Sequence, residues 1–106
     1  MTRSSPDIEG VHLPQLTPFT TLLVQTRNSL YRIVVTDGSK VYVQGGALFP
    51  TVTSAYLDGA CVRRNVLKLG WIVVGLGMEI HTDQRRVLTS PVRTIVKERA
   101  SIANVH

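Results

Sequence analysis

The chain has 106 residues, a formal net charge of +5 and 43% hydrophobic residues, which suits one domain built around one core. Cys61 is the single cysteine, so an internal disulfide and a Cys/His zinc framework are excluded. The N-terminus has no apolar signal core, and the longest apolar run, Trp71 to Met78, is far shorter than the about 18 residues that span a bilayer, so we expect a cytoplasmic protein.

The first 18 residues are expected to form an extended arm. Pro6, Pro14 and Pro18 each remove a backbone donor and favour extended structure. Such an arm can cross a neighbouring molecule. A single β domain is expected to follow over residues 19–97, with a C-terminal tail over 98–106.

The central part of the chain has the pattern of short β-strands. Strands are expected over residues 20–26, 30–36, 40–44, 53–57, 71–81, 86–89 and 92–97. Asp58-Gly59 is interpreted as a turn after the fourth of these, and Pro91 as a break before the last. Residues 60–68 fit either a strand or a short helical turn.

The Asp37-Gly38 pair marks the clearest hairpin. A two-residue turn would mix apolar and polar side chains on each face. A three-residue loop over 37–39 instead sets Val35 opposite Val41 and Ile33 opposite Val43, so that one face is apolar. We favour this second register.

The segment from Leu67 to Thr82 combines strand-forming residues with Gly70, Gly75 and Gly77. Glycine inside a strand marks a bulge, a bend or a close backbone approach, so we expect one long bent strand. Alternation directs one set of side chains inward and leaves a small or apolar second face, which we expect the N-terminal arm or a partner chain to cover. The inward set is Ile72, Val74, Leu76, Met78 and Ile80.

Six or seven short strands with frequent turns predict an all-β fold. The bent glycine-rich strand favours a small half-open antiparallel barrel of the SH3-like, Sm-like or OB-like kind. A two-layer β-sandwich is the alternative.

Most of the positive charge lies in the second half of the chain, and a basic excess can attract nucleic acid or another anionic ligand. The candidate binding residues are Arg32, Tyr42, Arg63, Arg64, Lys68, Arg85, Arg86 and Arg93. A cyclic-dinucleotide sensor of the PilZ type is disfavoured, because no Asp-x-Ser-x-x-Gly motif follows the first arginines.

Catalytic chemistry has little support in the sequence, so a non-enzymatic protein is expected. Walker, Gly-x-Ser-x-Gly and His-Glu-x-x-His motifs are missing, and no cofactor is expected. Glu79, His81 and Asp83 alternate and would share one strand face, but Asp83 fits a turn better, so a metal site is disfavoured. Cys61 is expected to be a buried structural thiol rather than a nucleophile.

Four motifs resemble those of a family of small uncharacterised bacterial all-β proteins. They are R-N-S-x-Y at 27–31, Q-G-G-x-x-F-P at 44–50, L-K-x-G-W-I-x-V-G-x-x-M-E-I at 67–80 and T-S-P-V at 89–92. The resemblance covers roughly residues 19–97. It implies a compact domain, and it transfers no activity and no site residue.

These observations together predict a non-enzymatic β-barrel interaction module that acts through its surface. We expect it to self-associate through edge strands or through the N-terminal arm, since an open sheet leaves unpaired backbone groups that a second copy can satisfy. A nucleic-acid or other anionic-ligand binding protein is the alternative function.

Overall fold

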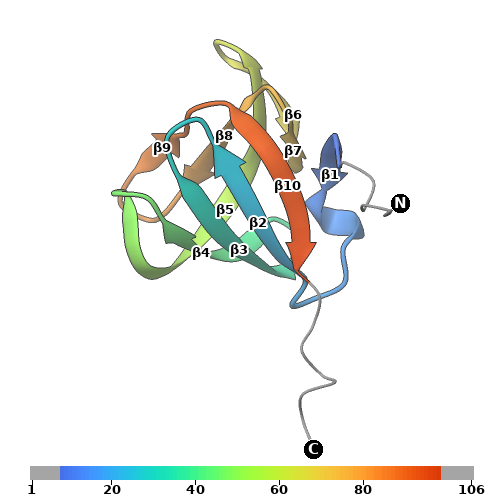
Figure 1. Ribbon diagram of the computed structural model, residues 1–106. Helices are drawn as coiled ribbons and strands as arrows, with labels where there is room; N and C mark the ends of the chain where they lie inside the picture. The colour runs from blue at the N-terminus through green and yellow to red at the C-terminus, as the bar shows by residue number, and fades with distance from the viewer. Residues whose placement is uncertain (1–7, 99–106) are drawn as a thin grey trace, which may run out of the picture.

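The computed structural model describes residues 8–98, which form ten strands and one 3-10 turn (Figure 1). The elements are β1 (Gly10–His12), η1 (Leu13–Gln15), β2 (Thr21–Thr26), β3 (Leu30–Asp37), β4 (Lys40–Gly45), β5 (Phe49–Arg63), β6 (Val66–Leu69), β7 (Trp71–Val73), β8 (Gly77–His81), β9 (Arg86–Leu88) and β10 (Val92–Glu98). The prediction of an all-β fold is confirmed. No helix in this range is long and apolar enough to cross a membrane.

Eight strands form one antiparallel sheet in the order β10-β2-β3-β4-β5-β8-β9, with β6 paired to β5. Strands β1 and β7 form a separate small pair. The path of the large sheet does not close on itself, because β10 and β9 stand at its two ends. One parallel bridge, between Val74 and Val92, connects the segment between β7 and β8 to the start of β10.

Five of the predicted strands are present as β2, β3, β4, β9 and β10, each within one residue of the expected bounds. The register of the β3–β4 hairpin is also confirmed: Val35 lies opposite Val41 and Ile33 opposite Val43. These four side chains are buried, so the apolar alternation selected the correct register.

The predicted turn at Asp58-Gly59 is wrong. Strand β5 runs for 15 residues through this point and carries a bulge between Leu57 and Gly59. Gly59 has a φ of +154°, and a Cβ there would collide with the backbone carbonyl of Lys68 on β6. The glycine therefore lets a neighbouring strand approach closely without reversing the chain. The ambiguous stretch at 60–68 is the hairpin of β5 and β6.

The single long strand predicted over 71–81 is divided into β7 and β8. Gly75 has a φ of +96° between them, a conformation that other residues adopt at a cost, and the chain there passes from the small sheet to the large one. The inward prediction holds for Ile72, Met78 and Ile80, which are buried, whereas Val74 and Leu76 are only partly buried.

In the described part of the first 18 residues, the expected extended arm contains strand β1 and the turn η1, and it packs on the domain. Strand β1 pairs with β7, the His12 ring stacks on Trp71 with 5.1 Å between centroids, and Leu13 is fully buried in the core. The Leu13 N–H donates to the carbonyl of Gly70 at 2.8 Å. The segment therefore lies beside β7 in a small sheet, and it covers the expected second face only at Trp71, through the His12 ring. Residues 1–7, and the tail predicted after Glu98, lie outside the described residues.

Candidate binding face

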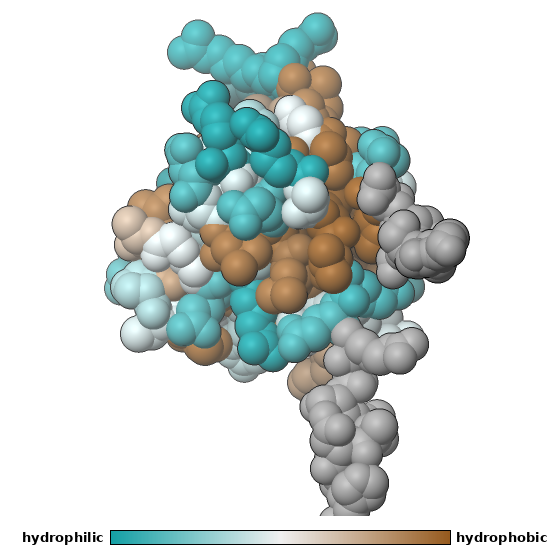
Figure 2. Space-filling model, viewed as in Figure 1, coloured by the Kyte–Doolittle hydropathy of each residue, from teal (hydrophilic) through white to brown (hydrophobic). Residues whose placement is uncertain are grey.

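Strands β10, β2, β3, β4 and the first half of β5 turn one side of the large sheet away from the core. We call this side the outer face, and it carries two adjacent rows of side chains. Strand registers define both rows. The first is Val96, Leu23, Arg32 and Gln44, and the second is Glu98, Thr21, Val34, Tyr42 and Ser54. Figure 2 shows apolar side chains gathered over β2 and β10 on this side.

Several apolar side chains of the outer face are exposed to water. Val96 is 52% exposed, Val52 63% and Tyr42 43%, while Leu23 and Val34 are half-buried. Strands of one-sided sheets normally place polar residues outward. A contiguous set of outward apolar side chains is instead typical of a surface that contacts another molecule.

A shallow groove of about 240 Å³ lies on the outer face. It is lined by Arg32, Val34, Tyr42, Gln44 and Val52, with Val43 at its base. Aliphatic walls, one phenol ring and one guanidinium give the groove both an apolar and a cationic component. Such a mixture suits contact with protein side chains, where aromatic residues and arginine contribute most.

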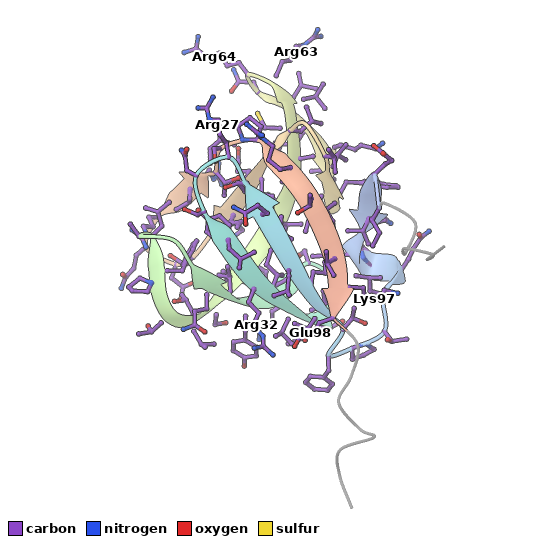
Figure 3. The ribbon with its side chains drawn as sticks, viewed as in Figure 1. Arg27, Arg32, Arg63, Arg64, Lys97 and Glu98 are labelled. Carbon is purple, nitrogen blue, oxygen red and sulfur yellow. The ribbon has the colours of Figure 1, made fainter. Side chains whose placement is uncertain are left out.

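Arg32 forms an ion pair with Glu98 across the outer face, with 3.5 Å between Nη2 and Oε1 (Figure 3). The two side chains are 55% and 38% exposed, so water screens the pair and it contributes little to stability. Both groups can still exchange partners when another molecule covers this face. The face therefore offers a cation and an anion side by side.

Two of the eight predicted binding residues, Arg32 and Tyr42, lie together in the groove of the outer face. Arg63 and Arg64 lie at the tip of the β5–β6 hairpin, at the other end of the molecule (Figure 3). Arg93 is exposed on β10. The Lys68 Nζ lies 4.3 Å from the centroid of the Trp71 ring, a cation–π contact near the small sheet.

The remaining two predicted residues have structural contacts. Arg85 donates to the backbone carbonyl of Leu48, and its guanidinium lies 5.5 Å from the centre of the Phe49 ring. This arginine therefore ties the β8–β9 turn to the loop before β5. Arg86 pairs with Glu79 at 3.4 Å across neighbouring strands.

The sequence analysis disfavoured a metal site at Glu79, His81 and Asp83, and the geometry of these side chains can be compared with that expectation. Within residues 8–98, no three His, Cys, Asp or Glu side chains lie close enough together to hold a metal ion. Glu79 instead pairs with Arg86, and the His81 Nδ1 lies 2.8 and 2.9 Å from the two carboxylate oxygens of Asp58.

The contact of Asp58 with His81 was not predicted from the sequence. The His81 ring also stacks on Tyr56, with 5.2 Å between centroids. The bulge between Leu57 and Gly59 sets the position of Asp58, and no local sequence pattern predicts this bulge. Asp58 lies at the edge of a second hollow of about 410 Å³, lined also by His12, Ser39 and Leu69.

Cys61 is half-buried, which corrects the prediction of a buried thiol. Its Sγ lies 3.5 Å from the carbonyl oxygen of Arg63. Its register partners are Leu67 on β6 and Gly77 at the start of β8. The side chain therefore lies at the base of the projecting hairpin.

No protein-family model, curated protein or solved structure matches this chain. The resemblance to a family of small bacterial proteins accordingly stays a prediction. The function must be argued from the surface of the molecule itself.

Proposed function

We propose that this chain is a non-enzymatic interaction module of the cytoplasm, a half-open β-barrel that self-associates through the outer face. The observation that carries the proposal is the continuity of outward apolar side chains across strands, from Val96 on β10 to Val52 on β5. The half-open barrel is supported by the Val74–Val92 bridge, which brings the start of β10 next to the segment between β7 and β8.

A second copy of the chain fits this face because the face is complementary to itself in charge. Arg32 and Glu98 lie next to each other on it. A two-fold axis between two such faces can place the arginine of one copy against the glutamate of the other, while apolar side chains meet around them. Closed two-fold contacts of this kind are the commonest form of protein self-association.

The edge of β10 supports the same arrangement. The start of β10 is bonded on its outer side: the Val92 N–H donates to Leu76 and the Gly75 N–H donates to Val92. Among residues 8–98, no strand pairs with this outer side beyond Val92. An edge strand with free backbone groups is a natural place for a second chain to add. The edge adjoins the outer face, so one contact can use both.

Light scattering of variants at several concentrations tests the proposal. Val96→Lys places a charge on the outer face and on the β10 edge, and we expect it to shift the protein toward monomer. Leu88→Lys is the matched control, because Leu88 is similarly exposed, at 57%, but lies on β9 away from the outer face. Equal association of the wild type and both variants would contradict the proposal.

A further inference from the structure

The β5–β6 hairpin projects from one end of the domain and carries two arginines at its tip (Figures 1 and 3). Arg63 lies opposite Val66, and Arg64 and Asn65 form the turn, with a φ of +62° at Asn65. All four residues are exposed. The tip is therefore a narrow, cationic projection that a large partner can reach.

Two further loops lie at this end of the molecule. The Arg27 N–H, in the turn between β2 and β3, donates to the carbonyl of Pro91 at 3.0 Å. Thr89 belongs to the same β9–β10 connection as Pro91, and its N–H donates to the carbonyl of Met78. Met78 lies opposite Ala60, near the base of the β5–β6 hairpin. Figure 3 shows Arg27 at the same end as the two tip arginines, while Lys97 lies at the opposite end. This group of Arg27, Arg63 and Arg64 is called the arginine end.

The arginine end is not neutralised by ion pairs within the described part of the chain. The ion pairs of residues 8–98 involve Arg32, His81 and Arg86 as the cations, and none includes a member of the arginine end. With a net charge of +5, the molecule also attracts polyanions over a longer range. Guanidinium groups bind phosphate through two parallel hydrogen bonds, which makes phosphate the matching ligand.

The distribution of aromatic rings selects among phosphate-bearing partners. Proteins that bind single strands stack bases on exposed rings, and membrane-surface proteins use aromatic anchors at the headgroup level. In residues 8–98 the rings lie away from the tip: Tyr31 and Phe49 in the core, Tyr42 and Tyr56 on the outer side of the sheet, Phe19 before β2, and Trp71 against His12. A duplex offers phosphates while its bases stay stacked, so it needs no ring.

We propose that the arginine end binds the phosphate backbone of double-stranded nucleic acid without reading its sequence. Arg63 and Arg64 contact phosphates from the tip, and Arg27 adds a third cation from the neighbouring turn. This contact is separate from the outer face and does not depend on self-association. Affinity of this kind comes from counterion release and falls steeply with salt.

Fluorescence anisotropy with a labelled random-sequence DNA duplex, measured over a range of salt concentrations, tests the proposal. The double variant Arg63→Gln/Arg64→Gln removes two phosphate contacts, so the slope of log affinity against log salt should become shallower by about 1.8. The same two contacts correspond to a loss of roughly 60-fold in affinity at about 0.1 M salt.

The matched control is Lys40→Gln/Lys97→Gln, which removes the same charge from exposed positions outside the arginine end. It should retain the wild-type salt slope, and unchanged thermal melting of both double variants would show that the fold is intact. The proposal is overturned by equal losses in the two double variants or by no duplex binding at low salt. Stronger binding to phosphatidylserine vesicles than to the duplex would also overturn it.

Discussion

Replacement of Leu13 by alanine tests whether the N-terminal segment belongs to the cooperative core. Leu13 is fully buried, and its backbone is held by the bond to Gly70, so the site cannot collapse freely around a smaller side chain. Leucine-to-alanine changes at such sites cost about 2–5 kcal/mol, and we expect about 3 kcal/mol here. For a domain of this size that loss lowers the melting temperature by roughly 12–20 °C.

Urea unfolding with two probes measures this effect. Trp71 is the only tryptophan, and its ring stacks on His12, so its fluorescence reports on the contact of the N-terminal segment with β7. Far-ultraviolet circular dichroism reports on the whole sheet. Coincident transitions are expected, because one cooperative unit unfolds in one step.

The control is Leu69→Ala, which deletes the same atoms from a side chain that is 71% exposed and close to the same segment. Its cost should stay below about 1 kcal/mol. A Leu13→Ala cost as small as that of the control, or a fluorescence transition well before the dichroism transition, would refute the assignment of this segment to the core.

Two other stability predictions concern the bulge in β5 and the β8–β9 turn. Gly59→Ala should lower the free energy of unfolding, measured by thermal denaturation, by at least about 2 kcal/mol. Gly38 also has a positive φ but has open space around it, so Gly38→Ala should cost about 1 kcal/mol. Equal costs would contradict the close approach at the bulge. Arg85→Ala should lower the free energy of unfolding by about 1 kcal/mol, because it removes the hydrogen bond to Leu48 and the contact with the Phe49 ring. Arg64→Ala at the exposed tip should change it by less than about 0.5 kcal/mol. A larger cost for Arg64→Ala than for Arg85→Ala would contradict the structural role of Arg85.

The parts of the fold that were predicted correctly are those set by local alternation. The β3–β4 register follows from the sequence because only one pairing places Ile33, Val35, Val41 and Val43 on the same face. Strand β10 was found because Pro91 marks its start and its apolar residues follow.

The errors arise where a glycine serves contacts between distant segments. Asp58-Gly59 has the composition of a turn, but the glycine is required by the carbonyl of Lys68, which reaches it only in the folded sheet. Gly75 similarly divides one apolar run between two sheets. Local composition carries no information on which strands become neighbours.

The candidate site was half predicted for the same reason. Arg32 and Tyr42 were selected for their charge and ring, and both line the groove. Val34 and Val52 were missed because the candidate residues were selected for charge and for an aromatic ring, and an aliphatic side chain has neither. Arg85 and Arg86 were selected for charge alone, although the structure gives each of them a partner on another segment.

Sedimentation equilibrium of the wild-type protein over a wide concentration range tests the proposed function most directly. One chain has a mass of 11.7 kDa. Self-association through the outer face predicts that the measured mass rises with concentration toward twice this value, and that the rise is lost in Val96→Lys. A mass that stays at that of one chain throughout the range would contradict self-association as the role of this face.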